Sequence, residues 1–431
     1  MKIKYWSTTC LLLAASVFSF AQEKRHLELE EVIQLAASQS SNAKLLDAQV
    51  KTSQLKYEEA KDSRLPDSKI SGTYLAINNP TVDLKMPMGS GDGLGISTNQ
   101  LFIGQLSINM PLYTGGKIKN GIKSAEDSWK ATAYESLASK EHLSLNAVHL
   151  YLGLYQAQQT ADLIAENIKK AEQQVVDFKA MEQNGIIARN DLLKAELQLS
   201  NFKVAHQEAL KNAKVINYQL NTLLGFDEHT VIEHISLDAV QPVDASLVED
   251  HAERNEIKSL LSQKDVAQDQ LKISKAAYHP TLFATGGYAA LHVQNLVTVT
   301  NAANIGLGVS YDIGSLYKNK KKIRVAQQQL SNIDDNIALT NDKIRNEINE
   351  ARENVNLAKK KNSLYAEALA QSNENYRIVK DKYENGVADT DDLLEADVQQ
   401  LQSKINLAIG EATLIEKYYD LLLATGHFNI K

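Results

Sequence analysis

The residues best suited to a chemical role lie in two short segments that resemble each other. Residues 185–193 read GIIARNDLL and residues 386–394 read GVADTDDLL, at an offset of 201 residues (386 − 185). In each segment a glycine can adopt the positive φ that ends one helix, and an aspartate is favoured at the start of the next helix. Asp191 and Asp392 are therefore candidates for ion pairs at a hairpin tip, and helix capping explains them equally well.

Other groupings of reactive side chains point to neither catalysis nor a cofactor. No nucleophile, base and orienting group form a recognisable set in the sequence. Residues 89–95 are rich in glycine but lack the Lys-Ser/Thr of a phosphate-binding loop. Four residues of one weakly patterned region could suggest a metal, but their spacing is not that of a zinc site, so we interpret them as surface or packing residues. These four are His229, Glu233, His234 and His251.

Composition and the N-terminus favour an exported protein that binds no nucleic acid. The formal net charge is −7, and no basic patch interleaved with aromatic residues is present. Residues 1–21 read as a signal peptide, with Lys2 and Lys4 ahead of an apolar run and a small-residue cleavage site at Ala21. Cys10 is the only cysteine, so no disulfide is expected in the mature chain. Beyond Ala21 no run of about 18 apolar residues predicts a transmembrane helix.

Very long helices are expected because the 431 residues include only 20 glycines and 6 prolines. Helical patterns cover residues 119–184 and 318–385, and each would be roughly 100 Å long, too long for a globular domain. Both carry a heptad seam, and the two seams are in phase at the same offset of 201 residues, as an internal duplication predicts. The seam residues are Ile164, Ile168, Ala171, Val175 and Phe178, then Tyr365, Leu369, Ser372, Tyr376 and Val379.

The same order of elements is predicted in two repeats, each with a helix, two strands of alternating polarity and a helical hairpin. The first repeat is 22–225, with strands at about 67–84 and 100–113 and a tip near 185–190; the second is 251–431, with strands at about 281–292 and 304–313 and a tip near 386–391. Residues 226–250 form a mixed segment between them. Two strands per repeat cannot close a sheet, and open edges are not viable in lipid, so closure demands oligomerisation.

These features resemble the TolC-type outer-membrane efflux protein family (outer membrane factors). The resemblance rests on PLYTGGK at 111–117 and on the tip sequences NGIIARNDLL and ENGVADTDDLLEA. It implies a mainly α protein with a transmembrane β part and a homotrimer embedded in outer-membrane lipid. Four strands per chain would form a 12-stranded outer-membrane β-barrel, and the coiled-coil hairpins would form a hollow periplasmic α-barrel. The mixed segment 226–250 would form a belt around its middle.

The resemblance also implies roles for residues at the tips. Gly185, Ile186, Gly386 and Val387 match positions that dock an adaptor, and Asp191 matches an aspartate that ties neighbouring helices together. Some members carry acidic residues one to two turns before the second tip glycine, where this chain has Arg377 and Lys380. These two cations either belong to the gate ion pairs or lie on a solvated helix face; a slightly rotated helix would instead present Asp381 and Glu384.

The function implied is a passive conduit of a tripartite efflux or type I secretion system. A periplasmic adaptor (membrane fusion) protein, coupled to an inner-membrane pump or ABC transporter, would open its tips. No enzyme activity, cofactor or metal is expected, and the cargo stays open between drugs, metals and proteins. The alternative is an exported structural coiled coil or adhesin without a pore. For the lysine run at Lys318 and 320–322, solvated charge is favoured over contact with lipid headgroups.

Overall fold

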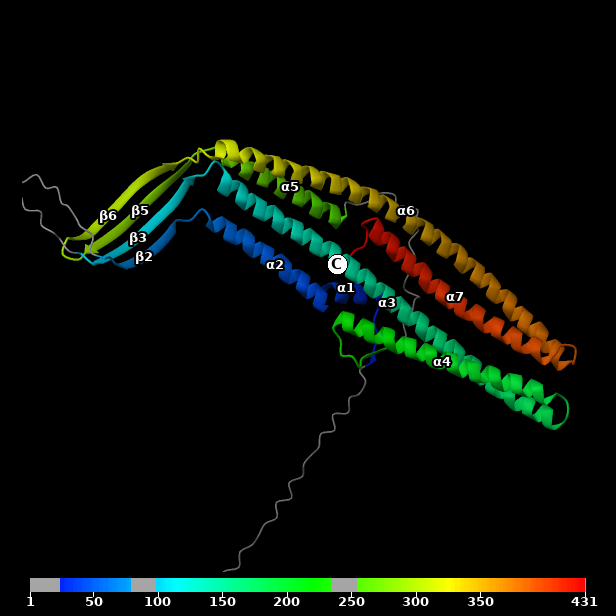
Figure 1. Ribbon diagram of the computed structural model, residues 1–431. Coiled ribbons are helices and arrows are strands. Elements are labelled where there is room, and N and C mark those ends of the chain that lie inside the picture. Colours follow the sequence, from blue (N-terminus) through cyan, green and yellow to red (C-terminus); the bar gives the residue numbers. More distant parts are fainter. Residues whose placement is uncertain (1–23, 79–97, 234–253, 431) are drawn as a thin grey trace, which may run out of the picture.

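The computed structural model describes residues 24–78, 98–233 and 254–430. The molecule is elongated, with a small sheet at one end and the tips of two helical hairpins at the other (Figure 1). The predicted signal peptide, the glycine-rich residues 89–95, His234, His251 and most of the predicted mixed segment lie outside the described ranges.

The protein is mainly helical, as the sequence predicts, and each half of the chain ends in one long helix followed by a returning helix. The first repeat contains α1 (Leu29–Ser38), α2 (Ser41–Asp62), α3 (Lys117–Gln183) and α4 (Arg189–Leu224), and the second contains α5 (Asn255–Ala276), α6 (Ser315–Glu384) and α7 (Thr390–Ala424). The first two are separated at Ser40, whose hydroxyl accepts a hydrogen bond from the Ala43 N–H at 3.0 Å and so caps α2. Among the described residues, no helix is long and apolar enough to cross a membrane.

One four-stranded antiparallel sheet joins the two repeats in the order β2-β3-β5-β6. Its strands are β2 (Asp67–Ala76), β3 (Gln100–Tyr113), β5 (Thr281–Val293) and β6 (Val297–Ser310). The register aligns the alternating apolar residues of all four strands on one face: Tyr74 opposes Phe102, and Ala284 opposes both Met110 and Leu307. In a single chain this face is exposed, and β2 and β6 are open edges.

The last strand differs from its predicted range of 304–313, because β6 begins at Val297 and ends at Ser310. The polar residues between 298 and 301 suggest a loop, but Val297 and Val299 pair with Val293 and Leu291 of β5, beyond a register shift at Ala289–Leu291. Asn295 adopts φ 59°, which closes a tight turn between the two strands. Beyond Ser310, the carboxylate of Asp312 accepts a hydrogen bond from the Gly314 N–H at 2.9 Å and turns the chain into α6.

The first strand is also shorter than its predicted range of 67–84. β2 ends at Ala76, and residues 77 and 78 follow it without strand structure. From residue 79 onward the predicted strand lies outside the described ranges.

The largest core lies in the middle of the molecule, where α1, α3, α4 and α7 meet. Val32, Val148, Leu220 and Leu224 are fully buried in it. The Tyr151 hydroxyl donates to the Leu27 carbonyl at 2.6 Å. Beside this core, β1 (Lys24–Arg25) pairs in parallel with β4 (Val231–Ile232).

Smaller apolar clusters extend from this core along the hairpins. Near the start of the first hairpin, Ile164 and Ala171 of the predicted seam pack with residues of α4 and α7. On α6, Ile344, Ile348 and Val355 pack against the end of α7. The heptad residues therefore hold each long helix against its returning partner.

Leu220→Ala should lower the free energy of unfolding by roughly 2–5 kcal/mol, because it leaves a cavity at a fully buried position. Lys211→Ala on the same helix is exposed and should change it by less than about 0.5 kcal/mol. Denaturant unfolding in detergent, followed by circular dichroism, measures both. Equal effects of the two variants would contradict the assignment of this core.

Candidate functional site at the hairpin tips

Both hairpins turn through the same backbone geometry. Gly185 and Gly386 adopt φ 72° and 71°, a conformation that glycine takes without strain. The Ile186 N–H donates to the Met181 carbonyl at 2.9 Å, and the corresponding bond in the second tip runs from Val387 at 2.8 Å. These bonds close the ends of α3 and α6, so three or four residues later a new helix begins.

Each tip presents one apolar side chain to its surroundings. Ile186 is 66% exposed and Val387 is 74% exposed. A Cβ placed on Gly185 or Gly386 would meet no atom within 4 Å, so both glycines are open as well. The four residues predicted to dock an adaptor therefore lie on the outermost surface, which docking requires.

The predicted tip aspartates both bind their own backbone. Asp191 Oδ2 accepts a hydrogen bond from the Ala188 N–H at 3.3 Å. Asp392 Oδ2 accepts from the Asp389 N–H at 3.3 Å, and Asp389 Oδ1 accepts in return from the Asp392 N–H at 3.0 Å. Helix capping is thus present at both positions within one chain.

Arg377 and Lys380 pair with acids on their own helix. The Arg377 guanidinium makes two hydrogen bonds to Glu374, at 2.7 and 2.8 Å, and its side chain is 68% exposed. Lys380 Nζ lies 3.9 Å from Glu384. In a single chain the structure does not bring these cations to Asp191 or Asp392, so their gate role stays a prediction.

The ion pair that does join the two hairpins involves residues that the sequence did not single out as partners. Lys194 Nζ of α4 lies 2.6 Å from Asp391 Oδ2 of α7 and 3.9 Å from Asp191 Oδ1. The hydrogen bond to Asp391 raises the pKa of Lys194. The only sequence signal was the extra aspartate in the second tip, and nothing indicated which cation it would meet.

An apolar cluster lies directly behind this ion pair. Phe178 and Leu192 from the first hairpin pack with Leu393 and Leu394 from the second. The rings of Phe178 and Tyr383 lie 5.7 Å apart between centroids. Leu192 of the first leucine pair and both leucines of the second therefore contribute to the contact between the hairpins, whereas Leu193 is 48% exposed.

A buried carboxylate lies one to two turns further from the tip. Asp397 Oδ2 of α7 accepts a hydrogen bond from Asn167 Nδ2 of α3 at 3.1 Å, whereas Asp397 Oδ1 is buried without a partner. Burial raises the pKa of Asp397. This contact couples the two hairpins at a cost in free energy whenever the carboxylate is ionised.

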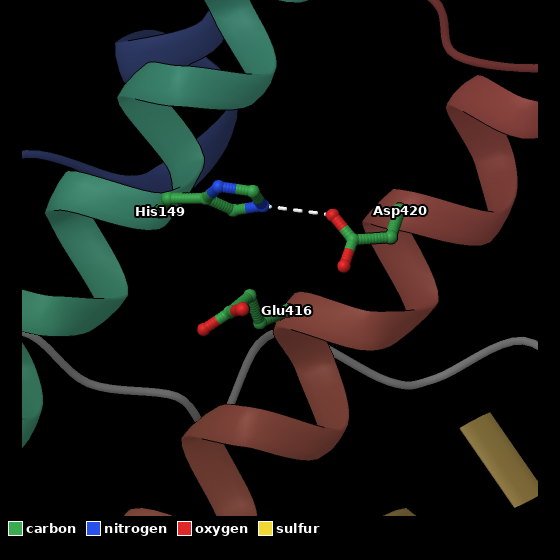
Figure 2. Close-up of side chains that lie close together, drawn as sticks. All are labelled: His149, Glu416 and Asp420. Carbon is green, nitrogen blue, oxygen red and sulfur yellow. Dashed lines mark hydrogen bonds and ion pairs between the residues drawn. The ribbon is translucent and has the colours of Figure 1, made fainter. Parts of the chain in front are cut away.

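A second polar cluster joins the repeats near the middle of the molecule. His149 of α3 faces Asp420 and Glu416 of α7, with 2.8 Å between His149 Nε2 and Asp420 Oδ1 (Figure 2). That hydrogen bond raises the pKa of His149. The three potential ligand atoms lie within 4.8 Å of one another. Lys417 Nζ, however, lies 2.7 Å from Glu416 and 3.0 Å from Asp420, so one ammonium group already forms ion pairs with both carboxylates.

The long hairpins, the sheet at one end and the open tips at the other define the class of outer-membrane channel folds. VceC from Vibrio cholerae superposes with a TM-score of 0.77 at 16% identity, covering 92% of this chain and 96% of VceC. The CmeC outer membrane channel of Campylobacter jejuni superposes with a TM-score of 0.78 at 18% identity, covering 93% of this chain and 85% of CmeC. The open state of the MtrE outer membrane channel of Neisseria gonorrhoeae superposes with a TM-score of 0.75 at 16% identity, covering 94% of this chain and 90% of MtrE. At these identities the likeness establishes the fold.

Sequence comparison establishes the family. Residues 32–226 and 248–427 match the family model described as outer membrane efflux protein, so the chain belongs to that family. The outer membrane efflux protein BepC of Brucella suis biovar 1 (strain 1330) is 24% identical over 329 residues, which are 74% of this chain and 71% of BepC. The resemblance inferred from the tip sequences and PLYTGGK is thereby confirmed.

Asp397→Asn should stabilise the protein at neutral pH and lose this advantage in acid. Burial raises the pKa of Asp397 above its ordinary value of 3.8, so the folded protein favours the protonated carboxyl group. The free energy of unfolding therefore falls as the pH rises from 3.8 through the raised pKa. The amide avoids that loss. Thermal unfolding of both proteins should show melting temperatures that converge towards acid pH. Asp162→Asn, at an exposed position of α3, is the control. A wild-type protein more stable at neutral pH would contradict the prediction.

Proposed function

We propose that three copies of this chain form a continuous, passive conduit from the outer membrane into the periplasm. The observation that carries the proposal is the exposed four-stranded sheet at the end opposite the tips. Its β2 and β6 edges leave one row of backbone groups unpaired on each side. In lipid such groups must be satisfied, and closure into a barrel achieves this.

A threefold arrangement fits the geometry of the sheet. If β6 of each copy pairs with β2 of the next, three sheets of four strands give a 12-stranded barrel with no free edge. The aligned apolar face would then contact lipid. This contact would cover Ile70, Ile305 and Leu307, which are highly exposed in a single chain. The opposite face carries more polar residues, among them Gln105, Ser107 and Asn109 of β3, which suit a water-filled lumen.

The tips are proposed to be the periplasmic end that opens. Ile186 and Val387 offer exposed apolar contacts to the hairpins of an adaptor protein. The Lys194–Asp391 ion pair and the apolar cluster behind it hold the hairpins of one chain together. Individually weak contacts of this kind allow docking energy to shift an open/closed equilibrium. An inner-membrane pump or ABC transporter would supply the energy of transport, and it would also select the cargo.

Arg377 and Lys380 keep a place in this proposal. Their exposed side chains lie about 2.5 and 1.7 turns before Gly386, where a narrowing of the conduit would bring three copies of each close together. Their pairing with Glu374 and Glu384 would make such a ring mixed in charge.

The structural alternative, a coiled-coil fibre or adhesin without a pore, leaves the apolar face of the sheet exposed to water. Planar-bilayer recordings on the detergent-extracted protein, with its mass determined in detergent, decide between the two. A trimer with stable conductance steps supports the conduit. A soluble protein, or a trimer that forms no pore even with its tips mutated, rejects it.

Gly386→Leu should reduce adaptor binding about tenfold or more, because leucine strains the positive φ of the tip and changes its surface. Gly386→Asn is the matched control, since asparagine tolerates this backbone conformation. Co-purification with the co-expressed cognate adaptor measures the effect, and the trimer should stay intact because a Cβ at this position meets no atom of the chain within 4 Å. Wild-type binding by the leucine variant would argue against a docking tip.

Lys194→Gln combined with Asp391→Asn should raise the open probability in bilayer recordings, by up to about fivefold for an exposed ion pair. The control is Lys203→Gln with Glu172→Gln, which removes a 2.9 Å ion pair within the first hairpin and leaves the contact between hairpins intact. Equal open probability in the two double variants would show that the Lys194–Asp391 pair does not restrain the tips.

A further inference from the structure

We propose that the basic segment at the start of α6 binds anionic phospholipid headgroups of the membrane leaflet that borders the sheet. The basic segment consists of Lys318, Lys320, Lys321, Lys322 and Arg324. The inference rests on the proposed function only in placing the sheet within the bilayer. It reverses the expectation from the sequence that this lysine run is merely solvated.

The first observation is the density of unbalanced charge. All five side chains of the basic segment are exposed, and the chain carries no acidic residue from Ser315 to Ile333. Within the described ranges, Lys320, Lys321, Lys322 and Arg324 make no ion pair with an acid of this chain. This concentration of positive charge occurs in a protein whose formal net charge is −7. It therefore needs an explanation beyond general solubility.

The second observation is where the charge begins. β6 ends at Ser310, and the exposed apolar side chains of Tyr311, Ile313, Leu316 and Tyr317 follow it directly. The chain thus changes from the apolar face of the sheet to exposed tyrosines and then to cations within a few residues. That order is the one expected where a protein leaves the hydrocarbon layer and crosses the headgroups. Lys318 Nζ also lies 5.9 Å from the centre of the Tyr317 ring.

The same charges recur in the first repeat. At the offset that relates the two tips, Lys117, Lys119 and Lys123 correspond to Lys318, Lys320 and Arg324. Lys117 and Lys119 are exposed at the start of α3, which also leaves the sheet directly. Lys123 differs from Arg324 because it has an acidic partner: its Nζ lies 3.7 Å from the buried Asp269. α3 and α6 both begin beside the sheet (Figure 1), so both helices carry cations close to it.

Helix electrostatics do not explain these cations. The N-terminus of a helix favours acidic residues, and α4, α5 and α7 each carry at least one in their first turn. α2, α3 and α6 have none there, and α3 and α6 begin beside the sheet with lysines instead. Within the isolated chain this arrangement is unfavourable, so it fits a setting in which an external anionic layer supplies the opposite charge.

The dimensions agree with a headgroup layer. From Tyr317 to Arg324 the helix advances by about 10 Å. A leaflet's headgroup region is roughly 5–8 Å deep, and lysine side chains extend their ammonium groups several ångströms along such an interface. The whole basic segment can therefore reach phosphate groups of one leaflet. Residues further down α6 lie beyond its reach.

The test uses the full-length protein purified in detergent and exposed to mixed micelles of equal phosphatidylglycerol and phosphatidylcholine, with retained lipid measured by mass spectrometry. The variant is Lys320→Gln/Lys321→Gln/Lys322→Gln. Its matched control, Lys359→Gln/Lys360→Gln/Lys361→Gln, removes the same charge from the same helix, roughly 60 Å further from the sheet. The variants' oligomeric state is checked by their mass in detergent.

Wild type and control should retain phosphatidylglycerol in preference to phosphatidylcholine, and the variant should lose at least about tenfold of that preference, since each cation near an anionic surface contributes about fivefold. Equal preference in variant and control would overturn the proposal. So would displacement of the lipid by glycerol phosphate, which would indicate a site for free phosphate. Altered ion selectivity in bilayer recordings with unchanged lipid retention would place the cations in the lumen and also overturn it. The lipid-retention measurement does not depend on conductance. If the protein forms no pore, the measurement still shows whether the basic segment binds anionic lipid.

Discussion

The unpaired backbone groups at the two edges of the sheet constrain the whole molecule. In one chain, β2 and β6 each leave a row of N–H and C=O groups without strand partners. A hydrocarbon environment makes such groups costly, and an aqueous environment makes the aligned apolar face costly instead. Pairing between copies removes the first cost, and lipid contact removes the second. The first solution demands the proposed assembly of copies, which would also cover helix surface that a single chain leaves exposed.

The helices join two ends with different chemistry. At the sheet, exposed tyrosines and cations follow the last strand. At the tips, two exposed apolar side chains stand beside several aspartates, one of which is paired with Lys194. The middle is held by a true core, where Leu220 and Val148 are fully buried. The largest core therefore lies away from the tips, as the proposed opening by an adaptor requires.

The sequence was most informative where structure repeats along the chain. Helix positions followed from the heptad seam, and both tips followed from glycine and aspartate. The start of β6 was missed because Thr298 and Asn301 resemble a loop, while the paired alternation of Val297 and Val299 became visible only beside β5. The contacts between hairpins were also missed. Lys194–Asp391 and Asn167–Asp397 depend on how two distant helices pack, and no spacing within either helix encodes that.

Positions related by the offset of 201 residues make unequal contacts between the hairpins. At the offset of 201 residues, Lys194 and Asp391 correspond to Glu395 and Asn190, which offer no attraction between opposite charges. Likewise, the Asn167–Asp397 pair corresponds to Ala368 and Glu196. In the proposed ring of three chains, each hairpin has one neighbour in its own chain and one in the next. The contact within a chain contains the Lys194–Asp391 and Asn167–Asp397 pairs. At the corresponding positions, the contact between chains would contain no such pair. Because the weaker of two contacts in series separates first, the ring would begin to open between chains, with each chain's two hairpins moving together.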